Sequence, residues 1–260
     1  GLQNDADVYL DFYNSRSYAN YVYNPETASY GYVYSQVGGG VNLGGPVTLL
    51  AQATANDPDN SPGNTTYASA ELYSDSLFDF NANGNLISLH AQGGDALDTS
   101  YSANESYLYV ETEYGGDILL GDVSLSPNGG LDLYTDSVYN DLGAVPDYGN
   151  ISTGLISSYG EGSFLDYISI YSDGTLTTPH TSFTANDIYL EAAQGDLTFD
   201  SLTALDGEVY VYADNGNVNL SGLTSSNNDG VYLYGINVTT ADVSATNGRV
   251  YINAFRGDLT

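Results

Sequence analysis

The chain has 260 residues, with 33 acidic side chains, three arginines and no lysine, so its formal net charge at pH 7 is −30. This charge excludes nucleic acid as a partner, because phosphate binding depends on lysine and arginine, and it excludes an anionic membrane surface for the same reason. No stretch approaches the ~20 apolar residues of a membrane-spanning helix, so we expect no membrane insertion.

The composition favours strands and turns. Tyrosine contributes 26 residues and glycine 30, whereas straight-chain helix formers are scarce. Cysteine is absent, so no disulfide can stabilise the fold, and burial and backbone pairing must do so instead. We therefore expect an all-β chain.

In chain order, the first half holds scattered short apolar runs that are typical of strands. They are Asp7-Val8-Tyr9-Leu10, Gly40-Val41-Asn42-Leu43 and Asn85-Leu86-Ile87-Ser88-Leu89. Residues 54–68 contain two prolines and no apolar alternation, which is typical of a loop. We expect irregular loops or excursions near 54–84.

Three further runs continue the pattern with varying spacing: Tyr107-Leu108-Tyr109-Val110, Gly130-Leu131-Asp132-Leu133-Tyr134 and Tyr167-Ile168-Ser169-Ile170-Tyr171. The first aliphatic residues of the first two runs are Leu108 and Leu131, but that of the third run, Ile168, follows only after a much wider interval. A second irregular segment is therefore expected near 136–165.

A regular repeat follows in the C-terminal third. The first aliphatic residue of its first strand recurs at positions 188, 209, 231 and 250, in Ile188-Tyr189-Leu190, Val209-Tyr210-Val211, Val231-Tyr232-Leu233 and Val250-Tyr251-Ile252. A second strand comes after a glycine turn, as Gly195-Asp196-Leu197-Thr198, Gly216-Asn217-Val218-Asn219 and Gly257-Asp258-Leu259-Thr260. A third apolar contact is expected at Leu202, Leu223 and Val243.

Three short strands separated by turns form one coil of a parallel β-helix. We predict a right-handed parallel β-helix (solenoid) with about 20-residue rungs, in which residues 1–260 form a single segment of a longer protein. Alternate residues of each strand face inward. Two inward stacks are therefore expected, one of Ile188, Val209, Val231 and Val250, the other of Leu190, Val211, Leu233 and Ile252.

The segment Gly207-Glu-Val-Tyr-Val-Tyr-Ala-Asp-Asn-Gly-Asn-Val-Asn-Leu resembles the haemagglutination repeats of filamentous-haemagglutinin-like exoproteins. These are large bacterial surface proteins of the two-partner secretion type, whose repeats stack as a right-handed β-helix. The resemblance covers 186–260 most closely and 84–135 more loosely. Ser126-Pro127-Asn128-Gly129 departs from the family's Asn-Pro-Asn-Gly secretion signature at its first residue and lies in mid-chain, so no secretion domain is assigned. The resemblance implies a secreted protein at the cell surface.

The outward residue between the two stacks is a tyrosine in each of the four C-terminal repeats: Tyr189, Tyr210, Tyr232 and Tyr251. Such an aromatic ladder could bind cell-surface glycans or pack neighbouring fibres side by side. The alternative is that outward tyrosine simply favours β structure.

Acidic turns are the candidate metal ligands. Asp57 and Asp59 lie close together near a glycine, and Asp196 and Asp258 occupy equivalent corners of the repeat. These side chains could bind Ca²⁺, which takes oxygen ligands, although the EF-hand spacing is missing. The alternative is a set of solvated turn carboxylates. Calcium is the one cofactor that the sequence suggests.

Catalysis finds little support, because acidic pairs arise by chance here and the two histidines lack a recognisable partner pattern. Our first hypothesis is a non-catalytic structural or adhesive segment of an extracellular surface fibre. It would self-associate, because residues 257–260 repeat 195–198 and end in mid-rung, where solenoids expose unpaired strand edges. The alternatives are a carbohydrate-active β-helix enzyme, such as a polysaccharide lyase or glycosidase, and a calcium-dependent surface-layer or biofilm matrix protein.

Overall fold

The structure of the protein is a computed structural model. It describes the backbone of the strands along the whole chain, and it describes side chains for residues 107–112, 116–125, 129–136, 148–158, 164–179 and 181–260. No helix occurs among the described residues. The prediction of an all-β parallel solenoid is confirmed, with rungs roughly 21 residues apart.

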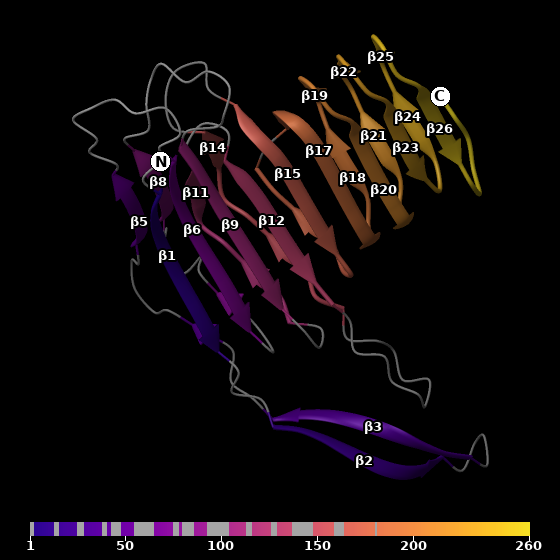
Figure 1. The fold of residues 1–260 in the computed structure, drawn as a ribbon. Coiled ribbons are helices and arrows are strands. Elements are labelled where there is room, and N and C mark those ends of the chain that lie inside the picture. The colour runs from indigo at the N-terminus through magenta and orange to yellow at the C-terminus, as the bar shows by residue number, and fades with distance from the viewer. Residues whose placement is uncertain are drawn as a thin grey trace.

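Each rung contributes strands to three faces. The longest face, which we call the long face, runs side by side in chain order (Figure 1): β1 (Gln3–Phe12), β6 (Thr65–Ser74), β9 (Asn104–Thr112), β12 (Gly130–Thr135), β15 (Leu165–Ser172), β17 (Ser182–Gln194), β20 (Val209–Asn215), β23 (Val231–Gly235) and β26 (Val250–Ala254). All neighbours on it pair in parallel.

The second face consists of two separate sheets. One contains β4 (Val41–Asn42), β7 (Phe78–Asp79), β10 (Ile118–Leu119), β13 (Ile151–Ser152) and β16 (Leu176–Thr177). The other contains β18 (Leu197–Phe199), β21 (Val218–Leu220) and β24 (Val238–Thr240).

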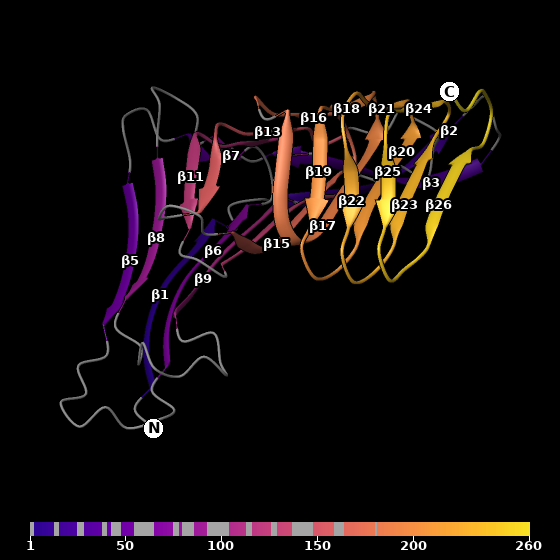
Figure 2. The same cartoon turned by 90° about the horizontal axis from the view of Figure 1, so that it is seen from above.

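The third face is divided in the same way. Its first part contains β5 (Thr48–Thr54), β8 (Leu86–Gln92), β11 (Asp122–Leu125) and β14 (Ile156–Ser158). Its second part contains β19 (Ser201–Ala204), β22 (Thr224–Ser226) and β25 (Val243–Ala245), which lie side by side in the view from above (Figure 2).

Strand β17 joins the two parts of the solenoid. Residues 182–185 pair with β19 on the third face, whereas residues 188–194 pair with β20 on the long face. One strand therefore passes around a corner of the coil. The long face runs through this point without a break. The second face starts a new sheet at β18, whereas the later part of the third face, β19, β22 and β25, is joined through β17 to the sheet of the long face.

One element departs from the coil. Strands β2 (Arg16–Asn24) and β3 (Ser29–Val37) form an antiparallel hairpin, which projects from the solenoid in Figure 1. The sequence pattern did not predict it.

The two predicted inward stacks are confirmed. Ile188 pairs with Val209, Val209 with Val231 and Val231 with Val250, and the second stack follows the same register. The first three members of each stack are fully buried, whereas Val250 is 42% exposed. Burying one such aliphatic side chain contributes ~1.5–3 kcal/mol, so each rung adds to the stability of the fold through these stacks.

The expected third apolar contact at Leu223 is wrong. Thr224, not Leu223, pairs with Leu202 and faces the core, and Leu223 is 48% exposed. Because side chains alternate along a strand, a shift of one residue reverses which of the two is buried.

The predicted irregular segments fall partly outside the described residues. Within 54–84 the backbone forms β6 and β7, and within 136–165 it forms β13 and β14, all in parallel pairs. Residues 137–147 and 159–163 lie outside the description.

Among the residues that the structure describes, there is no helix of the length and apolar character needed to cross a membrane.

Candidate functional site: the tyrosine and carboxylate face

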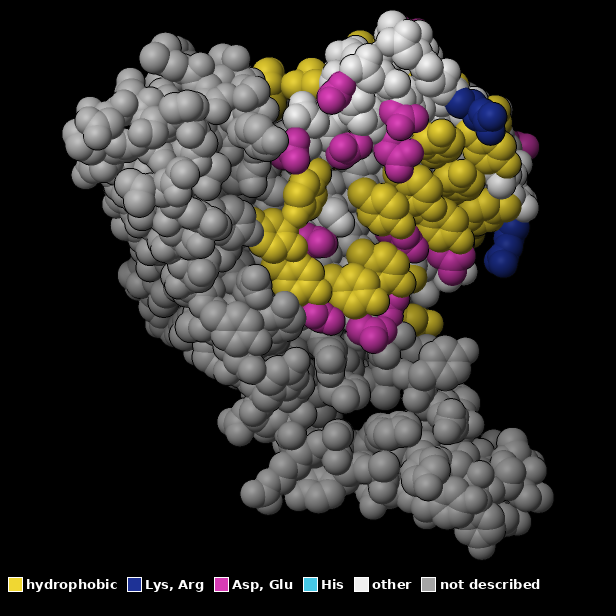
Figure 3. All heavy atoms as spheres, viewed as in Figure 1, with side chains coloured by type: hydrophobic (Ala, Val, Ile, Leu, Met, Phe, Trp, Pro, Cys, Tyr) yellow, Lys and Arg dark blue, Asp and Glu magenta, His cyan; other side chains and the backbone are white. Residues whose placement is uncertain are grey.

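The outer side of the long face carries most of the described tyrosines. Tyr189, Tyr210, Tyr232 and Tyr251 occupy matched register positions on β17, β20, β23 and β26. Figure 3 shows hydrophobic side chains, tyrosine included, gathered over this part of the long face, with acidic side chains between and around them. We call this surface the tyrosine face.

The ring contacts do not follow the predicted ladder throughout. Tyr189 and Tyr210 stack with centroids 4.5 Å apart and planes 2° apart. The next ring in contact with Tyr210 is Tyr234, at 5.4 Å, and Tyr234 in turn contacts Tyr251 at 5.5 Å. The Tyr232 ring instead lies over Gly230, where a Cβ would come within 2.5 Å of it.

Two further side chains widen this cluster. Tyr212 lies 5.8 Å from Tyr234 and 6.0 Å from Phe255, measured between ring centroids. The aromatic surface over β20, β23 and β26 is therefore a patch more than one residue wide. Upstream on the same face, Tyr134 stacks on Tyr171 at 4.9 Å and 18°.

Carboxylates are paired with the phenols in a repeated arrangement. On four strands, a tyrosine hydroxyl donates a hydrogen bond to the acidic residue two positions later: Tyr109 to Glu111 (2.7 Å), Tyr171 to Asp173 (3.0 Å), Tyr189 to Glu191 (2.7 Å) and Tyr212 to Asp214 (3.1 Å). Residues i and i+2 of a strand lie on the same side of a sheet, which brings each pair together.

Burial shifts the pKa values of these groups. It raises the pKa of the phenols of Tyr171 and Tyr189, with the hydrogen-bonded carboxylate as the next cause, and raises the pKa of Tyr210 to about 12. The pKa of Glu191 is also raised, first by burial and then by repulsion from Asp214 and Asp173, against the opposing hydrogen bond from Tyr189. The face thus keeps its phenols neutral and holds negative charge that is incompletely solvated.

The predicted metal ligand Asp196 lies at the corner between the long face and the second face. Its Oδ1 accepts hydrogen bonds from the backbone N–H and the side-chain amide of Asn217, both at 2.8 Å. Asn217 accepts from the amide of Asn237 at 2.6 Å, and Asn237 accepts from the backbone N–H of Asp258 at 2.9 Å. Two asparagines therefore stand between Asp196 and Asp258 along this corner, and the structure does not bring the two carboxylates together.

The remaining metal candidates, Asp57 and Asp59, lie outside the described residues. Within the part of the chain that is described, no three His, Cys, Asp or Glu side chains gather closely enough to hold a metal ion. Calcium binding therefore stays a prediction.

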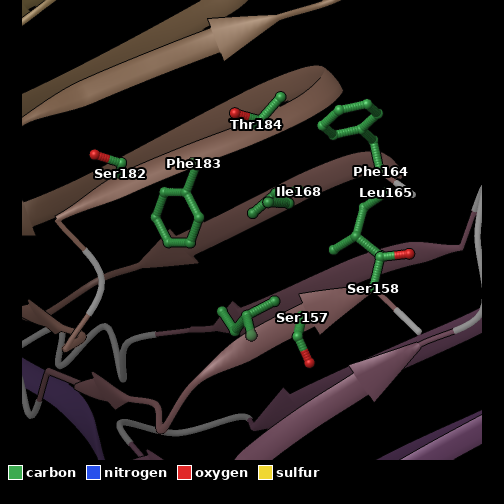
Figure 4. A pocket seen from close by; sticks show the side chains of 9 residues that line it. Ser157, Ser158, Phe164, Leu165, Ile168, Ser182, Phe183 and Thr184 are labelled. Carbon is green, nitrogen blue, oxygen red and sulfur yellow. The ribbon is translucent and has the colours of Figure 1, made fainter. Parts of the chain in front are cut away.

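A small hollow of about 80 Å³ lies where the third face is interrupted, between β14, β15 and β17 (Figure 4). Its lining mixes the apolar side chains of Ile156, Phe164, Leu165, Ile168 and Phe183 with the hydroxyls of Ser157, Ser158, Ser182 and Thr184. Its volume is well below the ~300 Å³ of ordinary ligand pockets.

The chain matches no protein-family model, no curated protein and no solved structure. The tyrosine and acid pairs, which were not predicted, do have a sequence signal. Tyr-x-Glu or Tyr-x-Asp recurs at residues 9–11, 73–75, 109–111, 134–136, 139–141, 159–161, 171–173, 189–191 and 212–214.

Proposed function

We propose that the chain is a non-catalytic structural and adhesive segment of an extracellular surface fibre. The observation that carries the proposal is the unbroken long face, which continues through β17 where the other two faces are interrupted. A solenoid of this kind extends in one dimension, and its outer surface repeats with each rung.

The tyrosine face supports an adhesive role. Stacked phenol rings offer flat apolar area at low entropic cost, with a polar hydroxyl at the edge. Neighbouring carboxylates such as Glu191 and Asp214 add hydrogen-bond acceptors for sugar hydroxyls. Cell-surface glycans are therefore the binding partner that we propose, together with other copies of the chain along the fibre.

The test is binding of the purified chain to immobilised polysaccharides, combined with electron microscopy. Replacing Tyr210, Tyr234 and Tyr251 with serine should abolish glycan binding while the circular dichroism spectrum is unchanged. The matched control replaces Thr198, Asn219 and Thr239, outward residues of the second face, with alanine. Equal binding by both variants, or discrete particles in place of filaments, would count against the proposal.

A carbohydrate-active enzyme is the second candidate, and the raised pKa of Glu191 is the observation that favours it. A carboxyl group that keeps its proton to higher pH suits a general acid. Depolymerisation of a polysaccharide by the native chain, lost in Glu191→Gln, would replace the fibre proposal with this one.

A further inference from the structure

Tyrosine is the dominant oxidisable side chain of this protein. The chain has no cysteine, methionine or tryptophan but 26 tyrosines. Thiols and thioethers are the usual targets of oxidants. In their absence, a one-electron oxidant acts first on phenol rings, and the question is which phenols are arranged to react.

Tyr189 and Tyr210 have the closest ring stacking of the described tyrosines, at 4.5 Å and 2°. They are direct register partners on adjacent strands, so their backbones hold the two rings side by side. The Tyr189 hydroxyl also donates to Oε2 of Glu191 at 2.7 Å. A general base must lie within hydrogen-bond reach of the proton that it accepts, and Glu191 does.

We propose that Tyr189 and Tyr210 are a site of oxidative cross-linking, at which a one-electron oxidant joins the two rings as dityrosine and Glu191 accepts the phenolic proton of Tyr189. The inference needs only the stacking of adjacent rungs. It is therefore independent of the fibre proposal, and either can fail without the other.

The chemistry balances with two one-electron oxidations. Each tyrosine gives one electron to the oxidant and loses its phenolic proton. The proton of Tyr189 passes to the Glu191 carboxylate and onward to water, and that of Tyr210 passes directly to water. The two neutral phenoxyl radicals form one carbon–carbon bond between their ortho positions. Each ortho hydrogen then moves to the phenoxyl oxygen, which restores both phenols, so two electrons and two protons leave for each cross-link.

Burial explains why the carboxylate matters. Both phenols are protonated at neutral pH, and burial raises the pKa of each further, so the rings stay neutral in moderately alkaline solution as well. Oxidation of a neutral phenol is favourable only when its proton leaves together with the electron, and a paired carboxylate provides that acceptor. Glu191 must be ionised to act, so cross-linking should slow as the pH falls through its raised pKa.

The experiment oxidises the purified chain with photogenerated tris(bipyridine)ruthenium(III), with persulfate as the final electron acceptor. Digestion after glutamate separates Tyr189 from Tyr210, because Glu191 and Glu208 lie between them. A fluorescent dityrosine peptide pair from the monomer fraction, containing these two residues, is the expected product. Dityrosine confined to covalent dimers, or linking other residues in the monomer, would overturn the proposal.

Three variants sharpen the result. Tyr210→Phe should remove the intrachain cross-link, whereas Tyr232→Phe, at the next rung but turned over Gly230, should leave its yield unchanged. Glu191→Gln should slow cross-linking severalfold at neutral pH and flatten its pH profile, an effect that loss of packing alone would not produce. An unchanged pH profile in Glu191→Gln would show that the carboxylate is not the proton acceptor.

Discussion

The rungs before and after β15 close the same corner of the coil with different chemistry. In the described strands β9, β12 and β15 the last inward position is a buried hydroxyl, that of Thr112, Thr135 or Ser172, and Thr135, for example, donates to the carbonyl of Gly149 at 2.9 Å. Downstream, the equivalent positions are small and apolar, at Ala192, Ala213, Gly235 and Ala254.

The links between the long face and the second face differ as well. The upstream links vary, since only residues 113–117 separate β9 from β10, whereas residues 136–150 separate β12 from β13. The upstream corner carbonyls accept hydroxyls in addition to a backbone donor: the carbonyl of Gly149 accepts the N–H of Gly174 at 2.7 Å and also the hydroxyls of Thr135 and Ser172. The downstream links are uniformly short, with only residues 195–196, 216–217 and 236–237 between the strands, and alanine or glycine occupies the corner. Short, uniform links thus go with a small apolar residue at this corner, whereas longer and more variable links go with a buried hydroxyl.

The largest expected effect is a charge in the regular core. Val211 is fully buried between Leu190 and Leu233, so Val211→Asp should destabilise the fold by about 3–5 kcal/mol, as an uncompensated buried charge does. Urea unfolding followed by circular dichroism measures the loss. Thr198→Asp, on the outer side of β18, is the control and should change stability little.

Exchanging the corner chemistry should have the next largest effect. Thr135→Val removes a donor to Gly149 and an acceptor from the N–H of Asp173, and should cost about 1–3 kcal/mol. Ala213→Ser is the reverse change downstream. It should cost about 1 kcal/mol, because the new hydroxyl would be buried without a hydrogen-bond acceptor. If Thr135→Val were neutral in thermal unfolding, the explanation from link regularity would be wrong.

The corner carboxylates test what the two regions share. Asp117 accepts from the backbone N–H and amide of Asn150 in the next rung, just as Asp196 accepts from those of Asn217. Asp117→Ala should cost about 1 kcal/mol, and Asp196→Ala should have a similar effect on the melting temperature. Replacing either aspartate with asparagine, which keeps an acceptor oxygen, should lower the stability less. A lower melting temperature in only one of the two variants would show that the corner carboxylates of the two regions are not equivalent.

A smaller effect is expected from pH. Burial raises the pKa of Asp132, Glu191 and Glu208, so the folded state binds protons more readily than the unfolded chain. Stability should therefore rise as the pH falls from 7 towards the ordinary glutamate pKa of 4.5. Asp200, with a lowered pKa, acts in the opposite sense only in more acidic solution. Glu191→Gln should reduce the rise in melting temperature, and a fall over this range would contradict the assignment.

Calcium should produce the smallest change. Because a ligand that binds only the folded state stabilises it, millimolar calcium should raise the melting temperature, and chelator should reverse this. Sodium chloride at equal ionic strength is the control for screening of the −30 charge. Identical melting curves in calcium and in chelator would remove the prediction.

The sequence predicted the core well for a simple reason. Alternation along a strand and a nearly constant interval between strands together determine which residues stack, as for Val209 under Val231. Thr224 was not predicted to face the core, because its apolar neighbour Leu223 suggested a register shifted by one residue.

The tyrosine face was less predictable. Register places Tyr232 correctly, but ring direction depends on space nearby, and Gly230 leaves room for the ring to turn away from the stack. The hairpin of β2 and β3 shares neither interval nor register with the coil, so a search for repeats could not find it.

The hydrogen bonds that side chains make between rungs also have a direction. Asn217, Asn237 and Ser221 each donate to an acceptor one rung earlier, and the backbone N–H groups of Leu155 and Glu208 do the same towards Asp122 and Asp187. A rung therefore has an acceptor side, facing the rung that follows it, and a donor side, facing the rung before. Whole rungs could be duplicated or removed within 187–229 and the new junction would still match donors with acceptors. A rung inserted in reverse polarity would bring carboxylates against carboxylates.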